Sequence, residues 1–279
     1  MTVDSYVVEK ISLDLPKYEV NEFITLVCNP EKENSVIVEV EGNHEDMYIS
    51  NGLLFYKALQ LALPEVNLRV SKYKDETMMY ELLKDHNTYL MNYYAASDDD
   101  IKFEESAPIK FTEEIMKKVA TAHNIVCEHN KKSKEDRDVN QWEPSRWGYS
   151  FQSYSSACYS PTVDLSILSI ITGIESLLVS GEGPLSYKIS MYSSLILSDN
   201  YEERLKINKL VKDMYKIRSK VVHGEISTVT RLLKKEDIYE KYFELRKIHS
   251  ELLIKTFELS EDDLFDAIDR QLFNSPSFN

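Results

Sequence analysis

Apolar side chains follow different periods in the two parts of this chain. In the N-terminal third the apolar runs are short, as in FITLVCN (23–29) and SVIVEVEG (35–42), which favour two strands of a hairpin or meander. EVNLRVSKY (65–73) favours another strand. GLLFYKALQLAL (52–63) favours a helix that stops at Pro64, because proline lacks the amide hydrogen and clashes with the preceding turn. This part is predicted to be a small α+β domain.

From residue 110 onward the apolar residues recur at helical spacing. Thr112, followed by acidic residues, is a suitable N-cap for a helix over 111–132. Further helices are predicted at 147–160, 162–180, 184–198, 201–223 and 235–259. The turns between them contain Gly or Pro, except for the one at residues 199–200. We therefore predict a mainly α chain with an α+β domain over residues 1–105, an acidic linker around 97–108 and an all-α bundle over 110–279.

Charge is divided unevenly between these two parts. The chain carries a net charge of −14, and residues 1–105 hold 9 Lys and Arg against 21 Asp and Glu, whereas the remainder holds 24 against 26. Residues 204–223 contain seven basic side chains and one acid, Asp213. A local positive strip can attract a polyanion even on an acidic protein, because screening acts over roughly 8 Å at physiological salt. The alternative interpretation is the solvated face of an amphipathic helix.

Targeting and membrane signals are weak in this sequence. The first twenty residues alternate apolar and charged side chains without a basic start, so they resemble neither a signal nor a transit peptide. The most apolar segment, 163–179, contains Asp164 and Glu175 and is too short and polar for a membrane span. Three cysteines at uninformative spacings favour reduced thiols. We expect a cytoplasmic protein that does not bind a membrane.

An arginine occupies an unusual position in the helix predicted at 201–223. At about 100° per residue, Arg218 lies near the centre of a broad apolar face. That face is formed by Ile207, Leu210, Val211, Met214, Tyr215, Ile217, Val221 and Val222. A charge there needs a partner. Glu175, embedded in its own apolar helix, is one candidate, and a twofold interface between two copies of the chain is the other explanation.

Two segments together resemble a known family. They are PTVDLSILSIITGIESLLVSGEGPLSYKISMYSSLIL and EERLKINKLVKDMYKIRSKVVHGE, of which the second contains the arrangement Y-x-x-R-S-x-x-V-H-G. The chain resembles the ApeA-like branch of the HEPN family over about residues 147–260, with YFELRKIHSELLIKTFEL (242–259) as the terminal helix. The first hundred residues show no such resemblance.

The resemblance implies a dimerising helical domain that acts as a metal-independent endoribonuclease in bacterial antiviral defence or as a toxin. It assigns Arg218 and His223 as the catalytic pair. RNA supplies its own nucleophile in the 2′-hydroxyl, so the protein has to supply a proton acceptor and donor, a role suited to histidine. It also has to supply a cation beside the phosphate, a role suited to arginine. We expect RNA and a second copy of the chain as partners, and no metal or cofactor.

Other residues are expected to support this pair. Glu175, Tyr215 and Ser219 are predicted to be supporting residues, although many active family members carry Asn, Asp or His at the position of Ser219. Lys209, Lys212, Lys216 and Lys220 are the candidate RNA-binding residues. Tyr187 and Tyr215 can stack on bases or fill the core, and their helical spacing favours the core.

Two functional questions remain open at this point. The alternative to an RNase is a non-catalytic HEPN module for dimerisation or partner binding. The acidic N-terminal domain is a possible sensor or regulatory domain that binds a partner or ligand.

Overall fold

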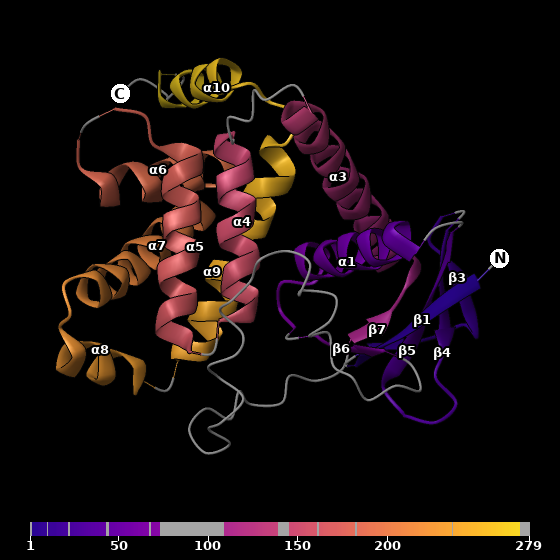
Figure 1. Cartoon of the computed structure of the whole chain (residues 1–279). Coiled ribbons are helices and arrows are strands. Elements are labelled where there is room, and N and C mark those ends of the chain that lie inside the picture. The colour runs from indigo at the N-terminus through magenta and orange to yellow at the C-terminus, as the bar shows by residue number, and fades with distance from the viewer. Residues whose placement is uncertain are drawn as a thin grey trace. The chain divides into compact units, whose positions relative to one another are not determined.

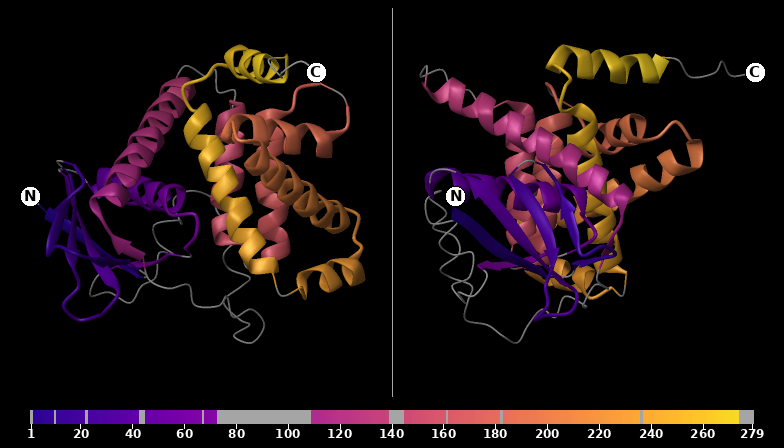
Figure 2. Two further views of the ribbon diagram at one scale, coloured as in Figure 1. Left: turned by 180° about the vertical axis from the view of Figure 1, so that it is seen from behind. Right: turned by 90° about the vertical axis from the view of Figure 1, so that its right-hand side faces the viewer.

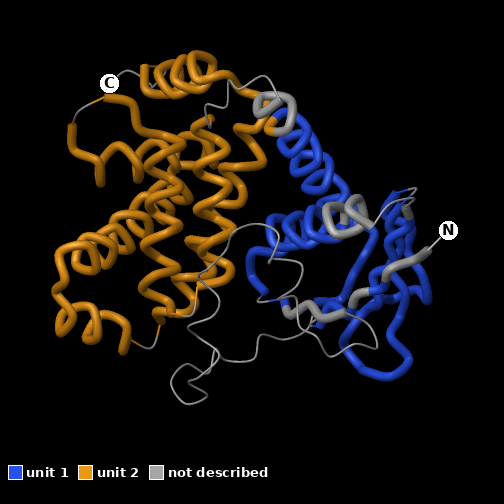
Figure 3. Tube along the Cα trace, in the orientation of Figure 1, with its two compact units in different colours: residues 1–132 blue, residues 133–279 orange. Residues whose placement is uncertain are grey.

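The computed structural model describes these parts of the chain: residues 2–9, 11–21, 23–42, 45–66, 68–72, 109–138, 145–160, 162–181, 183–235 and 237–273. They belong to two units, residues 1–132 and 133–279 (Figure 3). The described part is mainly helical, with a small antiparallel sheet near the N-terminus. This confirms the predicted order of an α+β part followed by a helical part.

The first unit is built on a five-stranded sheet in the order β3-β4-β5-β1-β6 (Figure 1). The strands are β1 (Thr2–Glu9), β3 (Lys17–Glu19), β4 (Ile24–Cys28), β5 (Ser35–Gly42) and β6 (Arg69–Lys72). β4 and β5 form the predicted antiparallel pair, with Leu26 opposite Val38. β1 was not anticipated. It pairs antiparallel with β5 on one side and with β6 on the other.

A helix packs on this sheet. α1 (Glu45–Ala62) contacts β5 and buries Leu53, Phe55 and Leu59. It ends just before Pro64, as predicted, but begins seven residues earlier than the predicted start at residue 52. The apolar signal therefore located the buried end of the helix, whereas its more polar first turns carry no such signal.

The first unit extends well beyond residue 105. β7 (Ile109–Phe111) pairs in parallel with β2 (Ile11–Leu13), and α3 (Glu113–Asp138) follows directly. The Thr112 hydroxyl accepts a hydrogen bond from the amide of Ile115 at 3.4 Å, which confirms the predicted cap. β2 and β7 form a second, two-stranded sheet, and β2 also contacts β4 and β5. The start of α3 therefore belongs to the first unit, whose boundary lies at 132/133. The linker predicted at 97–108 falls outside the described residues.

The second unit is a helical bundle (Figures 1 and 2). Its described helices are α4 (Arg146–Tyr159), α5 (Val163–Leu178), α6 (Leu185–Leu197), α7 (Tyr201–Val222), α8 (Ile226–Leu233), α9 (Ile238–Thr256) and α10 (Glu261–Phe273). α5 is central and packs against α4, α6, α7 and α9, which explains why its sequence is apolar on most sides. α8 and α10 were not anticipated. No helix within the described ranges is long and apolar enough to cross a membrane.

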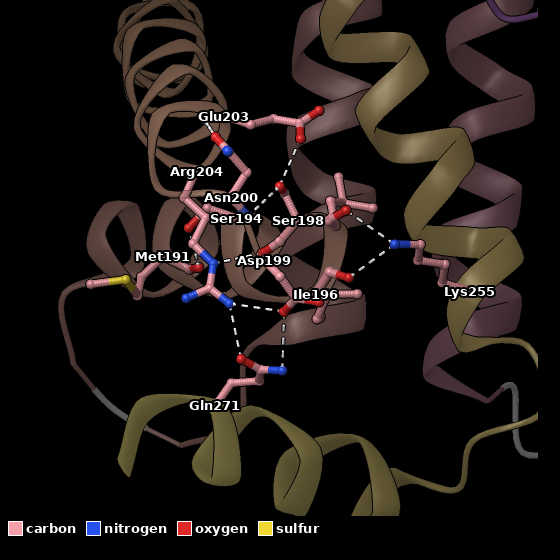
Figure 4. Close-up of polar contacts among 11 residues, drawn as sticks. Met191, Ser194, Ile196, Ser198, Asp199, Asn200, Glu203, Arg204, Lys255 and Gln271 are labelled. Atoms are coloured by element: carbon pink, nitrogen blue, oxygen red, sulfur yellow. Dashed lines mark hydrogen bonds and ion pairs between the residues drawn. The ribbon is translucent and has the colours of Figure 1, made fainter. Parts of the chain in front are cut away.

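A polar cluster fixes the connection between α6 and α7 (Figure 4). Arg204 donates from Nε to the carbonyl of Ser198 at 2.6 Å and from Nη2 to Oε1 of Gln271 on α10 at 2.9 Å. Lys255 of α9 donates to the carbonyl oxygens of Ile196 and Leu197 at 3.2 and 3.0 Å. The helix end would otherwise leave such carbonyl groups without partners. Arg204, the first member of the predicted basic strip, therefore has a structural role.

Candidate functional site

The C-terminal end of α7 determines where His223 lies. Gly224 has a φ of +69°, a left-handed conformation that favours glycine. Its amide donates to the carbonyl of Val221 at 3.0 Å, and the amide of Glu225 donates to the carbonyl of Lys220 at 3.0 Å. This pair of bonds is the Schellman arrangement. The His-Gly sequence thus ends the helix and leaves His223 at the C-cap with an exposed side chain.

Arg218 is paired with Glu175 within the same chain. Its Nη2 lies 2.8 Å from Oε2 of Glu175 on α5, and the two side chains are only 22% and 14% exposed. The Arg218 guanidinium carbon also lies 5.6 Å from the centre of the Tyr215 ring, within the range of a cation–π contact. The charge of Arg218 on the apolar face of α7 is therefore neutralised inside the bundle. Its partner is Glu175, one of the two partners considered from the sequence.

The pair is held by one hydrogen bond rather than two. Nε of Arg218 and Oε1 of Glu175 are both buried and have no hydrogen-bond partner in the part of the chain that the structure describes. Burial raises the pKa of the Glu175 carboxyl, and the neighbouring Arg218 limits that rise. Nε of Arg218 and Oε1 of Glu175 can therefore each form a further hydrogen bond. Burying polar atoms without such bonds is unfavourable in an ion pair that has only a structural role.

Arg218 and His223 diverge within one chain. Five residues of α-helix correspond to about 140° of rotation and about 7.5 Å of rise. Arg218 is directed to Glu175 on α5, whereas His223 is exposed at the end of α7. The amide of His223 donates to the carbonyl of Ser219 at 3.1 Å. The backbone thus connects Ser219 to His223.

The candidate RNA-binding lysines differ in their surroundings. Lys216 pairs with Asp213 at 2.8 Å, and Lys220 pairs with Glu225 at 2.7 Å. Nζ of Lys212 lies 6.0 Å from the centre of the Tyr187 ring, and Lys209 is exposed. Exposed ion pairs contribute little to stability, so these side chains can exchange their partners for phosphate groups.

Two predictions about apolar side chains are wrong. Val222, placed on the apolar face of α7, is 54% exposed and is the last residue of the helix. Tyr187, assigned to the core, is 49% exposed, since it lies near the start of α6 at the surface. Tyr215 is half-buried. Val211, Met214 and Ile217 are buried, as predicted.

Sequence reasoning missed a buried polar group in α9. Arg246 and His249 are 1% and 0% exposed. The Ser150 hydroxyl lies 2.8 Å from Nε2 of His249, and the Tyr154 ring lies edge-on to the imidazole at 5.3 Å. Arg246 and His249 are three residues apart among the apolar residues of a predicted helix. This spacing places them on one side of the helix and was the signal in the sequence that could have identified them. Within the described ranges, no three His, Cys, Asp or Glu side chains are grouped so as to hold a metal ion.

The ion pair of Arg218 and Glu175 is expected to stabilise the folded protein. Arg218→Ala is expected to lower the free energy of unfolding by about 2 kcal/mol at neutral pH, because it leaves a mostly buried carboxylate without its cation. Adding Glu175→Gln should restore part of this loss. A carboxyl whose folded pKa lies above its ordinary value of 4.5 contributes stability that is lost as pH rises through the folded value. The defect of Arg218→Ala should therefore be smaller at pH 5 than at pH 7.

Urea unfolding of the full chain at both pH values measures this effect. Lys216→Ala is the matched control, since Lys216 is 71% exposed in its own ion pair, and it should change stability by no more than about 0.5 kcal/mol. Equal stability of Arg218→Ala and the wild type at pH 7 would show that the pair is not formed in solution.

Comparison with known proteins adds no further information about this site. No protein-family model, curated protein or solved structure matches this chain.

Proposed function

We propose that residues 133–279 contain a HEPN-type domain and that the protein is a metal-independent endoribonuclease. The observation that carries this proposal is Arg218. It is held by Glu175 through a single 2.8 Å hydrogen bond, on a helix that ends with His223 exposed at its C-cap. An arginine, a histidine and surrounding lysines supply the charge and proton transfer that RNA cleavage requires.

The reaction assigns a separate role to each side chain. His223 takes the proton from a ribose 2′-hydroxyl as its oxygen attacks the adjacent phosphorus, and the bond to the 5′-oxygen breaks. The proton that His223 has taken is then passed to the leaving 5′-oxygen, so the products are a 2′,3′-cyclic phosphate and a 5′-hydroxyl. Arg218 stabilises the negative charge on the phosphorane through its donors. Glu175 positions Arg218, Tyr215 packs against it, and Ser219 supports His223.

A second copy of the chain completes the site in this proposal. Arg218 and His223 diverge on one α7 helix, and a twofold axis beside this helix would place both pairs in a shared cleft. The homodimer is therefore part of the proposed active form. We further propose a cytoplasmic effector that acts in antiviral defence or as a toxin.

A different observation favours a non-catalytic alternative. Val222 and Ile226 flank His223 and are 54% and 77% exposed. Large apolar side chains exposed next to each other suit a surface that binds another protein. In this alternative, the ion pair of Arg218 and Glu175 is structural and α7 with α8 forms a dimerisation or partner-binding surface.

The chemistry of the RNA ends distinguishes these functions. The purified wild-type protein is expected to cleave RNA in the presence of EDTA and to leave 2′,3′-cyclic phosphate and 5′-hydroxyl ends. In bacteria its expression should degrade RNA and arrest growth or restrict phage. Products with 3′-hydroxyl ends, or an absolute need for magnesium, would contradict the mechanism. Intact RNA with a folded dimer would favour the binding module.

A further inference from the structure

Tyr187 forms an exposed aromatic surface on α6. Its side chain is 49% exposed, and Nζ of Lys212 on α7 lies 6.0 Å from the centre of its ring. An exposed tyrosine leaves apolar surface in contact with water, which is unfavourable. Its position beside a cation suggests a ligand that contacts both the ring and the ammonium group. About half of the Tyr187 surface is accessible to such a ligand.

The packing of α6 against α7 holds this aromatic surface in place. One turn beyond Tyr187, the Ser190 hydroxyl donates to the carbonyl of Tyr187 at 3.0 Å and accepts from Nδ2 of Asn208 at 3.2 Å. Ser190 is fully buried, and Asn208 lies one turn before Lys212 on α7. The ring and the lysine are thus attached to two helices whose register is fixed.

Lys212 belongs to a row of side chains that leads toward His223. Lys212, Lys216, Ser219 and His223 follow one another at intervals of four, three and four residues, so their directions fall within about 60° on one side of the helix. From Lys212 to His223 the row extends about 16.5 Å along the helix axis. The Tyr187 ring lies beside Lys212 at one end of the row, and the exposed His223 side chain lies at the other end. A single strand that follows this row would therefore contact the aromatic ring, the lysines and His223.

We propose that Tyr187 and Lys212 form a subsite that stacks an unpaired base of single-stranded RNA next to the cleavage site. The inference rests on the proposed RNase function and names its substrate class. Grooves that bind single strands combine cations for the phosphates with aromatic rings for the bases. In an RNA duplex the base faces are covered by their neighbours, and recognition uses the backbone and the minor groove. The Tyr187 ring therefore selects single strands over duplexes.

The subsite is tested by binding, without cleavage as the readout. The probe is a short single-stranded RNA with 2′-O-methyl riboses, which 2′-hydroxyl attack cannot cleave, and a second strand of equal length with abasic positions. Stacking of one base contributes about 1–3 kcal/mol, so Tyr187→Ala should weaken binding of the first strand by about five-fold to 150-fold. Tyr187→Phe keeps the ring and should bind like the wild type.

Two comparisons provide the controls. The abasic strand should bind the wild type and Tyr187→Ala equally weakly, because both retain Lys212. Tyr149→Ala removes a tyrosine of similar exposure, 52%, from α4 and should bind the first strand like the wild type.

The contrary outcomes distinguish failure of the subsite from failure of the RNase function. The subsite is overturned if Tyr187→Ala binds both strands like the wild type, or if the wild type binds a duplex more tightly than the single strand. Failure of the wild type to bind any RNA would overturn the subsite and the RNase function together. Base-dependent binding through Tyr187, combined with no RNA cleavage, would leave the subsite and reject the catalytic role.

Discussion

Replacing His223 by alanine is expected to lower the rate of RNA cleavage by about 10²–10⁴-fold, the usual contribution of a general acid or base. Thermal unfolding should stay unchanged, because the His223 side chain is exposed and the bonds at the end of α7 involve its backbone and Gly224. Initial cleavage rates of a single-stranded RNA and melting curves of the same samples measure both effects.

Two further variants make this prediction specific. Arg218→Lys keeps the positive charge but lacks the planar set of donors, so it too should lose most of the activity. Arg231→Ala removes an exposed cation from α8 and should cleave like the wild type. If His223→Ala cleaves at the wild-type rate, the catalytic assignment of this residue is wrong. A marked fall in its melting temperature would instead indicate a structural role.

The second large effect is expected at Gly173, in the middle of α5. A Cβ atom at this position would lie 2.4 Å from Cε1 of His249 and 3.0 Å from Cβ of Ser153. The imidazole cannot easily retreat, because it is fully buried and 2.8 Å from the Ser150 hydroxyl. Alanine is favoured over glycine within a helix by about 1 kcal/mol, but overpacking a core costs typically about 1–3 kcal/mol and occasionally more.

The clash should therefore dominate. We expect Gly173→Ala to lower the free energy of unfolding by about 1–2 kcal/mol, the overpacking cost less the gain in helix propensity, and Gly173→Val to lower it further. Chemical denaturation of the full chain measures this change. Thr172→Ala, at an exposed position of the same helix, should change stability by no more than about 0.5 kcal/mol. If Gly173→Ala is as stable as the wild type, α5 and α9 do not approach each other this closely.

A double substitution identifies the cause of the defect. His249→Ala removes the ring that meets the new Cβ atom. Combined with Gly173→Ala, it should destabilise the protein by less than the sum of the two single changes, since contacting residues are not additive. Additive effects would show that the clash involves another atom.

Local signals predicted much of the secondary structure. Pro64 marks the end of α1, Thr112 caps α3, and His223 with Gly224 ends α7. Each of these depends on neighbouring residues and on the geometry of one chain segment, so the sequence alone is sufficient. The same holds for the central helix α5, whose apolar residues outnumber its polar ones because helices cover it on most sides.

The elements that were missed depend on distant partners. β1, with the sequence TVDSYVVE, lacks a regular alternation of apolar and polar residues and becomes a strand by pairing with β5 and β6. β7 has three residues and is placed by pairing with β2, almost a hundred residues earlier. Short segments carry too few residues for a periodic pattern, so their structure follows from the contacts they make.

The candidate site was also predicted in part from the sequence and in part depends on contacts between helices. The position of Arg218 on an apolar face indicated that it needs a partner, and the sequence offered Glu175 and a second copy of the chain as alternatives. The choice of Glu175, 43 residues away, follows from the packing of α5 against α7. The exposure of Tyr187 and the structural use of Arg204 depend on how α6 packs on α7 and on where α10 lies. Periodicity describes one helix at a time, whereas burial and partnership are properties of the contacts between helices.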